Sequence, residues 1–244
     1  MEAALEKARG FVAEGAAIID IGAESARTNR AAIGEAEEAE RLGGFVSRWR
    51  AEFPGPASPL LSINTWRPAV ARAVLRVGGD ILNDIGALPT DENARICAQT
   101  GAALLIMHSV GVPKVAHTHV GYDDVMARLD EFFAEKIALA EAAGVAREAI
   151  ILDPGIDFAK QRDDNLRIFR ELDRLQKFGR PILLPISRKT VIGDVLGIAD
   201  AAERDPGTVA CLVQGMLRGA QIFRVHNVRA AVQALRIVEA VEAA

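Results

Sequence analysis

The hydrophobic and polar positions of this chain follow two alternating patterns. Short, nearly continuous apolar runs are typical of strands that are buried on both faces. Such runs occur at Ala17–Ile21, Pro59–Ile63, Asp80–Asn83, Ala102–Met107, Ala149–Leu152, Pro181–Leu184 and Gln221–Val225. Apolar residues three and four positions apart predict about eight helices in the other segments. Examples are Glu2–Glu14, Ile33–Trp49, Pro68–Val77, Tyr122–Ala143, Asn165–Lys177 and Pro206–Arg218, and Val228–Glu242 closes the chain.

The alternation of strands and helices predicts βαβ units and a parallel sheet. No low-complexity linker or shift in composition interrupts it, so we expect a single domain over residues 1–244. This length suits one α/β barrel. The number of predicted strands fits an eight-stranded barrel without its first strand, and it fits a seven-stranded open sheet as well.

Composition and charge exclude several classes of protein. The net charge of −4 argues against a dedicated nucleic-acid binder, whose signature is a basic surface. No apolar run reaches the roughly 18 residues of a membrane span, and the N-terminus lacks the features of a secretory signal. Cys97 and Cys211 stand alone, without metal-ligand spacing, which fits inert thiols in a reducing compartment. We therefore expect a cytoplasmic protein with no nucleic-acid partner and no membrane partner.

Polar side chains gather where the predicted strands end. In chain order these groups are Asp20 to Arg27, Asn64-Thr65, Asn83-Asp84, His108-Ser109, Asp153-Pro154-Gly155, Ser187 to Thr190, and Arg224 to Asn227. A single polar residue at such a position is usually a helix cap. Because the carboxyl ends of barrel strands carry the active site whatever the chemistry, the whole series predicts an active site.

The same segments resemble the blocks of the dihydropteroate synthase family. IDIGAESAR is similar to the family's IDIGGESTRP, SINTW to its S-I-D-T, and ILNDIGAL to the block built on N-D. IMHSVGVP resembles M-H-x-x-G-x-P, ILDPGIDFAK resembles DPGxGFxK, PISRKTVIG resembles S-R-K-x-x-I-G, and FRVHNV resembles R-V-H-D-V. These matches follow the family's order from about residue 15 to residue 230, which makes the set much more specific than any one block.

This resemblance implies an α/β fold, the TIM (β/α)8 barrel, which we expect here without its first strand and first βα loop. It implies a transferase of folate biosynthesis that joins 6-hydroxymethyl-7,8-dihydropterin pyrophosphate to p-aminobenzoate and releases pyrophosphate. It further implies Mg2+ as cofactor, sulfonamides as inhibitors and a homodimer built on the C-terminal helices. Mg2+ commonly binds through substrate phosphate oxygens, so we assign no residue of the chain as its ligand.

The resemblance also implies roles for individual residues, and the chemistry of their side chains suits these roles. The Asp153 carboxylate accepts the two neighbouring N–H groups of a pterin in charge-assisted bonds, and Asn83 reads adjacent ring nitrogens. Lys189 presents a cation to the ring. Arg224 and His226, which would alternate on one strand and face one side, form with Arg27 an anion clamp for pyrophosphate. We predict Lys189, Asp153, Arg224 and His226 as catalytic, and as substrate-binding these four with Asn64, Asn83, Phe158, Thr190 and Arg27.

Three departures from the family pattern bear on activity. Asn64 stands where the family has an aspartate, so the hydrogen bonds stay and the charge is lost. Ala26 and Thr28 replace a hydroxyl residue and a proline beside the aminobenzoate site. The family's first strand and its N-x-T-P-D-S-F-S-D-G loop would precede residue 1.

Three other interpretations stay open at this point. A pterin-binding relative, either methyltransferase-like or catalytically silent, would keep the pterin residues without the synthase reaction. A metal-dependent hydrolase would use His117 and His119, although these lie in a long predicted loop and not at a strand end. A phosphate-binding barrel of another pathway is disfavoured because the chain has no glycine-rich phosphate loop.

Overall fold

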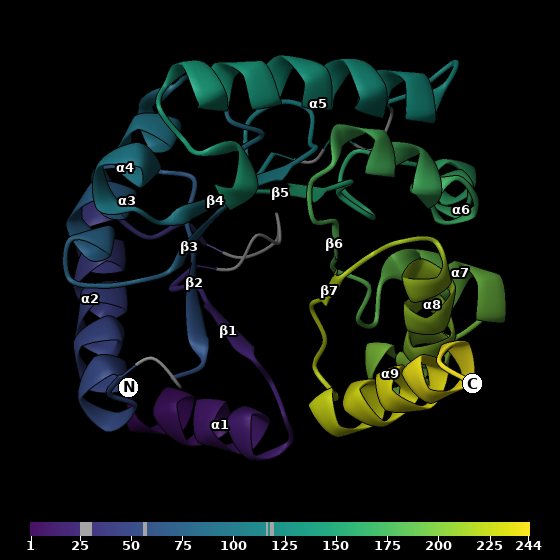
Figure 1. The fold of residues 1–244 in the computed structure, drawn as a ribbon, viewed down its shortest axis with the longest axis horizontal. Coiled ribbons are helices and arrows are strands. Elements are labelled where there is room, and N and C mark those ends of the chain that lie inside the picture. The colour runs from purple at the N-terminus through teal and green to yellow at the C-terminus, as the bar shows by residue number, and fades with distance from the viewer. Residues whose placement is uncertain (25–30, 56–57, 116, 118–119) are drawn as a thin grey trace. The chain divides into compact units, whose positions relative to one another are not determined.

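The computed structural model describes residues 1–24, 31–55, 58–115, 117 and 120–244 (Figure 1). Its chain divides into two compact units, and each is described here by itself. The first comprises Met1–Met107, Gly111–Ala116 and Lys136–Ile150; the second comprises His108–Val110, His117–Glu135 and Ile151–Ala244. The single domain expected over residues 1–244 stays a prediction.

The first unit is a parallel sheet with helices along it. Its elements are α1 (Glu2–Ala13), β1 (Ile18–Ile21), α2 (Glu35–Glu52), β2 (Leu60–Asn64), α3 (Pro68–Leu75), β3 (Ile81–Asp84), α4 (Glu92–Thr100) and β4 (Ala103–Met107). Strands β1 to β4 pair in chain order, and all three pairs are parallel. Helix α5 (Val125–Ala142) begins in the second unit and ends in the first.

The core of the first unit explains why its strands are so apolar. Leu61, Ile63, Leu82 and Leu104 are fully buried, as expected for a sheet covered on both faces. On α2, the Trp49 ring is also fully buried and stacks on another ring of the same helix, with 5.9 Å between centroids. Helices α2, α3 and α4 follow one another along the sheet (Figure 1). The βαβ units predicted from the alternation are confirmed here.

The second unit holds the remaining strands and the C-terminal helices. Its elements are β5 (Ile150–Asp153), α6 (Arg162–Arg170), the 3-10 helix η2 (Leu172–Phe178), β6 (Leu183–Leu184), α7 (Thr190–Leu196), η3 (Ala201–Arg204), α8 (Asp205–Leu217), β7 (Ile222–Phe223) and α9 (Val228–Glu242). A parallel bridge joins Leu152 to Ile182, and β6 pairs in parallel with β7. The helices α8 and α9 pack against each other.

Two predicted spans are wrong in detail. The helix expected over Asn165–Lys177 is two elements. Helix α6 begins earlier, with a capping box at Gln161, and ends at Arg170; after Glu171 the chain continues as η2. The strand expected over Gln221–Val225 is only β7, so Arg224 and His226 follow the strand instead of alternating on it. The Arg224 N–H still donates to the Leu184 carbonyl (3.1 Å) and continues the pairing by one bond.

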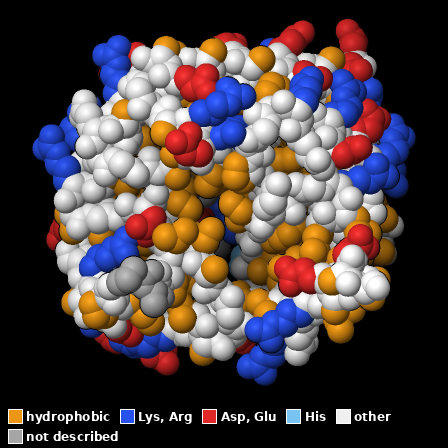
Figure 2. All heavy atoms as spheres, in the orientation of Figure 1, with side chains coloured by type: hydrophobic (Ala, Val, Ile, Leu, Met, Phe, Trp, Pro, Cys, Tyr) orange, Lys and Arg blue, Asp and Glu red, His pale blue; other side chains and the backbone are white. Residues whose placement is uncertain are grey.

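The surface carries both signs of charge. Figure 2 shows Lys and Arg side chains interspersed with Asp and Glu side chains over the visible face. Several form ion pairs, such as Arg174 with Asp130 at 3.0 Å. Within the part of the chain that the structure describes, no helix is long and apolar enough to cross a membrane.

Candidate active site

Asp153 stands at the carboxyl end of β5 in a turn that fixes its direction. Its Oδ1 accepts the Gly155 N–H at 2.7 Å, which is the turn that Asp favours before a glycine. Its carbonyl accepts the His108 N–H at 2.9 Å. Gly155 has φ +69°, and a Cβ there would stand 2.0 Å from the His108 carbonyl oxygen. Glycine is therefore required at position 155 by space as well as by conformation.

Burial changes the pKa of the Asp153 carboxyl group. The residue is 3% exposed, and this burial raises the pKa of its carboxyl group to about 6. The Gly155 N–H and the cations Lys189, Arg224 and Lys160 oppose the rise. Asp153 is thus a buried carboxylate surrounded by positive charge, ready to accept hydrogen bonds from a ligand.

The buried Lys160 side chain donates hydrogen bonds to the backbone of this turn. Its Nζ donates to the carbonyl oxygens of Gly155 (3.0 Å) and Phe158 (3.1 Å), and it lies 2.8 Å from His108 Nδ1. Burial lowers the pKa of the Lys160 amino group to about 7. Burial, together with the charge on Lys160, also lowers the pKa of His108 to about 2, so this imidazole is neutral and accepts from Lys160.

Lys189 lies at the start of α7 beside the same turn. Its Nζ donates to the Ile156 carbonyl at 2.7 Å and lies 4.7 Å from the centre of the Phe158 ring. Burial lowers the pKa of this amino group to about 8; Asp157 and Asp153 raise it and Arg224 lowers it. Such a lysine carries its charge at neutral pH and presents it over an aromatic face.

Asp157 links the turn after β5 to helix α7. It occupies the position of the second glycine in the family's DPGxGFxK block and adopts a left-handed conformation with φ 65°. Its carboxylate accepts the N–H groups of Thr190 and Val191, and the Asn165 amide. Because Lys189 precedes Thr190 directly, these bonds fix the lysine relative to the turn.

Arg188 and Asp205 form a second link in this unit. The guanidinium donates twice to the carboxylate, at 2.8 and 3.0 Å, a bidentate geometry that is strong and specific. The Asn227 amide donates to the same carboxylate at 3.1 Å. In the exposed loop after β7, Ser187 Oγ accepts the backbone N–H of His226 (3.0 Å) and lies 2.8 Å from its Nδ1. The segments carrying Lys189 and His226 are therefore fastened to each other.

The first unit contributes a separate polar group at the ends of β1, β2 and β3. Asn64 is the last residue of β2 and pairs in register with Asn83. Asp20 on β1 accepts from Ser62 Oγ at 2.6 Å and from Asn83 Nδ2 at 3.1 Å. The Asn83 side chain is almost fully buried, and its Oδ1 has no partner among the described residues.

Two buried glutamates organise the loop region of the first unit. Arg67 lies between Glu24 (3.0 Å) and Glu38, and both carboxylates are almost fully buried. Lys114 adds a second cation 3.4 Å from Glu24, which also accepts the Ile33 N–H at 3.2 Å. These bonds hold the chain immediately before and shortly after residues 25–30. Arg27, predicted for the anion clamp, lies outside the described residues.

The structure thus groups the predicted residues within each unit. In the second unit the residues Asp153, Phe158, Lys189 and Thr190 meet around one turn, while Arg224 and His226 lie in the loop that follows β7. In the first unit Asn64 and Asn83 are neighbours. Sequence reasoning assigned no role to Lys160, Asp157 or Asp20. The first two lie inside the ILDPGIDFAK block and Asp20 lies inside IDIGAESAR, so their places in these blocks were the available signal.

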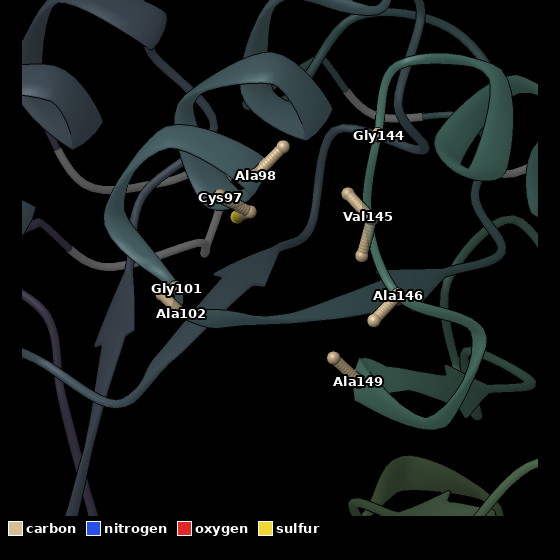
Figure 3. A pocket seen from close by; sticks show the side chains of 8 residues that line it. All are labelled: Cys97, Ala98, Gly101, Ala102, Gly144, Val145, Ala146 and Ala149. Atoms are coloured by element: carbon tan, nitrogen blue, oxygen red, sulfur yellow. The ribbon is translucent and has the colours of Figure 1, made fainter.

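A small cavity in the first unit lies away from these polar groups. It has a volume of about 130 Å³ and is lined by the end of α4 and the segment before β5, with Cys97, Ala98, Gly101, Ala102, Gly144, Val145, Ala146 and Ala149 (Figure 3). It lies at the amino end of β4, and its lining is small and apolar. Burial raises the pKa of the Cys97 thiol to about 12, so this thiol is unreactive.

Comparison with known proteins agrees with the geometry. Residues 1–226 match the family of pterin binding enzymes. The dihydropteroate synthase of Escherichia coli is 37% identical over 237 residues, which cover 97% of this chain and 82% of that protein.

Two solved structures are similar over the whole chain. The Xanthomonas albilineans dihydropteroate synthase with 4-aminobenzoic acid has a TM-score of 0.91 and 34% identity, covering 100% of this chain and 85% of the other. The Yersinia pestis enzyme with a pterine-sulfa conjugate has a TM-score of 0.90 and 34% identity, covering 100% and 90%.

The parallel α/β fold and the buried carboxylate turn fit the pterin-binding class, and the similar solved structures confirm the predicted TIM-barrel fold class. Within this class the chain belongs to the dihydropteroate synthase family, the transferases of folate biosynthesis. The resemblance seen in the sequence is confirmed, and the hydrolase and the barrel of another pathway are no longer needed as interpretations.

Proposed function

We propose that this chain joins 6-hydroxymethyl-7,8-dihydropterin pyrophosphate to p-aminobenzoate and releases 7,8-dihydropteroate and pyrophosphate. The observation that carries the proposal is Asp153, a buried carboxylate that a tight turn holds at a strand end beside Lys189. A buried charge is costly unless it has a partner. A ligand with two adjacent N–H groups is the partner that this geometry suits.

The reaction requires one bond to form and one to break. The aminobenzoate nitrogen attacks the methylene carbon attached to the pterin, and the carbon–oxygen bond to pyrophosphate breaks with its electron pair on oxygen. The amine then loses one proton to solvent or to the leaving group. In this proposal Asp153 orients the ring, while the Lys189 cation contacts it. Phe158, whose ring lies under the Lys189 amino group, packs beside the aminobenzoate.

The leaving group is dianionic or more, so positive charge aimed at its oxygens stabilises the transition state. We assign this role to Arg224 and His226, which lie in the loop after β7. The bond from the His226 N–H to Ser187, and the pair that Arg188 forms with Asp205, hold this loop to the segment that carries Lys189. Thr190, which is also predicted to bind substrate, donates its N–H to Asp157 at the start of helix α7.

The magnesium ion belongs to the proposal without a protein ligand. In the described part of the chain no three His, Cys, Asp or Glu side chains come together as a metal site. The residues present therefore do not form a cage for Mg2+, and no step of the reaction is assigned to the ion. We propose that Mg2+ arrives with the pyrophosphate, whose oxygens are its preferred ligands.

The remaining proposals concern the state of the protein. We propose a cytoplasmic homodimer that contacts its copy through the C-terminal helices. Exposed apolar side chains on α8 and α9 support this, with Leu217 at 55% exposure and Ile237 and Val241 at 67% each. Sulfonamides, which resemble p-aminobenzoate, are proposed to compete with it.

The experiment that tests the function follows pyrophosphate release. We expect release when the protein, dihydropterin pyrophosphate, p-aminobenzoate and Mg2+ are combined, and a product with the mass of dihydropteroate. Omitting the amine is the control and is expected to stop release. Pterin binding in a calorimeter without release in the complete mixture would instead support a silent pterin-binding relative, for which the neutral Asn64 is the available argument.

The pH dependence of kcat/KM is expected to be bell-shaped. Burial raises the pKa of Asp153 to about 6, so the carboxylate gains a proton and stops accepting as the pH falls below that value. Burial lowers the pKa of Lys189 to about 8, so the cation is lost as the pH rises above it. Because kcat/KM reports groups of the free enzyme, its maximum is expected near pH 7.

A Lys189→Arg variant distinguishes the acid side of the pH profile of kcat/KM from its alkaline side. A guanidinium keeps its charge throughout this range, so the alkaline limb is expected to disappear while the acid limb stays. Binding of 6-hydroxymethyl-7,8-dihydropterin, which has no pyrophosphate to titrate, is the control for the acid limb. A profile without an acid limb in both measurements would rule out Asp153 as the titrating group.

A further inference from the structure

Asp20 holds the amide of Asn83 from one side. The carboxylate Oδ1 accepts the Asn83 Nδ2 at 3.1 Å and the Ser62 hydroxyl at 2.6 Å. Residues 20 and 62 lie opposite each other in β1 and β2, and Asn83 stands one strand further on. All three strands are parallel, so this group is built into the rigid sheet and does not depend on a loop.

The hydrogen bond to Asp20 determines the orientation of the Asn83 amide, because it decides whether the oxygen or the nitrogen points away from Asp20. The two ends of an asparagine amide have nearly the same shape, so its oxygen and nitrogen can exchange places unless a neighbour distinguishes them. Because Asp20 Oδ1 accepts from Asn83 Nδ2, the amide turns its NH2 group toward Asp20. The Asn83 oxygen is therefore directed elsewhere. It is buried, and it has no partner among the described residues.

A buried acceptor without a partner is costly, and at a strand end that carries the predicted site residues a ligand can supply the missing donor. The ring of a 7,8-dihydropterin carries a hydrogen on N8, whereas N8 of the fully oxidised pterin carries a lone pair. An oxygen facing N8 would accept a bond from the reduced ring and would repel the oxidised one.

Resting on the proposed function, we propose that Asp20 is a positioning residue that locks the Asn83 amide with its oxygen toward the pterin, and that this lock selects the 7,8-dihydro ring over the oxidised ring. The selection acts through Asn83, and Asp20 itself does not touch the substrate. Without the lock the amide is free to turn its NH2 group toward the ligand, which suits the oxidised ring.

The test measures the affinities of 6-hydroxymethyl-7,8-dihydropterin and 6-hydroxymethylpterin by calorimetry and takes their ratio. The unaltered protein is expected to prefer the dihydro ring about tenfold or more, the equivalent of one hydrogen bond of about 1.4 kcal/mol. In Asp20→Asn the partner of Asn83 both donates and accepts, so the ratio is expected to fall about tenfold, mainly through tighter binding of the oxidised ring.

The matched control is Ser62→Ala. It removes the hydrogen bond from the Ser62 hydroxyl to Asp20 and leaves the Asn83 bond in place, so the ratio of the unaltered protein is expected. If Asp20→Asn does not fold, Asn83→Ala removes the selecting oxygen directly and is expected to bring the ratio near one. An unchanged affinity ratio in folded Asp20→Asn would overturn the proposal that Asp20 orients the Asn83 amide, and would leave the proposed function intact. Failure of the unaltered protein to bind either ring would overturn the proposed function as well.

Discussion

Replacing Asp153 with asparagine is expected to weaken binding of dihydropterin pyrophosphate about 1,000-fold. The variant keeps the shape of the side chain but replaces an acceptor by an amide whose NH2 group meets the donors of the ring. Charge-assisted hydrogen bonds contribute about 1.5–3 kcal/mol each, and two of them account for a loss of this size. Calorimetric titration with the pterin pyrophosphate, and kcat/KM from pyrophosphate release, measure it.

The same variant is expected to be at least as stable as the unaltered protein at pH 8. Burial raises the pKa of Asp153 above its value in an unfolded chain, so the folded state favours the neutral acid. The charged form therefore costs stability above about pH 6, and this cost disappears as the pH falls toward the ordinary value. Asparagine removes the charge at every pH. Gain of stability with loss of binding is the signature of a residue kept for its function.

The control is Asp163→Asn, an exposed aspartate in the first turn of α6. It changes the net charge by the same amount and is expected to leave pterin binding unchanged. Retained affinity in Asp153→Asn would remove Asp153 from the pterin site. A variant that loses both affinity and stability would indicate that the carboxylate serves the turn more than the ligand.

The sequence predicted the ends of the strands well because buried parallel strands and polar strand ends leave a local pattern. Asn64 closes β2, Asn83 lies near the end of β3, and Asp153 closes β5, as the apolar runs indicated. No residue range was predicted for helix α7. With seven residues it is too short for a three- and four-residue spacing to repeat convincingly.

Other features depend on contacts that no local pattern records. Arg224 and His226 were expected to alternate on a strand, but β7 ends at Phe223, and His226 is held by Ser187, 39 positions earlier in the sequence. The bond from Asn83 to Asp20 joins residues 63 positions apart. Lysine is seldom buried, so nothing in the composition of the block indicated that Lys160 lies inside the protein.

The burial of Lys160 leads to the second large effect. Measured above about pH 10, where the buried charge no longer costs stability, Lys160→Met is expected to lower the free energy of unfolding by about 2–4 kcal/mol. The reason is that the carbonyls of Gly155 and Phe158 and the His108 ring lose their donor while they stay buried. The turn that carries Asp153 then relaxes, and a weaker affinity for the pterin is expected to accompany the loss. Urea unfolding and calorimetric titration measure the two effects.

The pH dependence of the unaltered protein supplies an independent check on this lysine. Burial lowers the pKa of Lys160 to about 7 from its ordinary value of 10.5, so the unfolded chain binds more protons between these values. Stability from this group therefore rises as the pH increases from 7 toward 10.5, and the cost of the buried cation is fully present below 7. In Lys160→Met this part of the dependence is expected to disappear.

Lys7→Met is the control, because Lys7 is exposed on α1 and the substitution has the same change in charge and shape. We expect it to alter stability by no more than about 0.5 kcal/mol. If Lys160→Met is equally mild, the three acceptors find water or other partners, and the lysine does not hold the turn. If Lys160→Met lowers stability while pterin affinity is unchanged, the turn keeps Asp153 in place without Lys160. Lys160 then contributes to the stability of the fold and not to pterin binding.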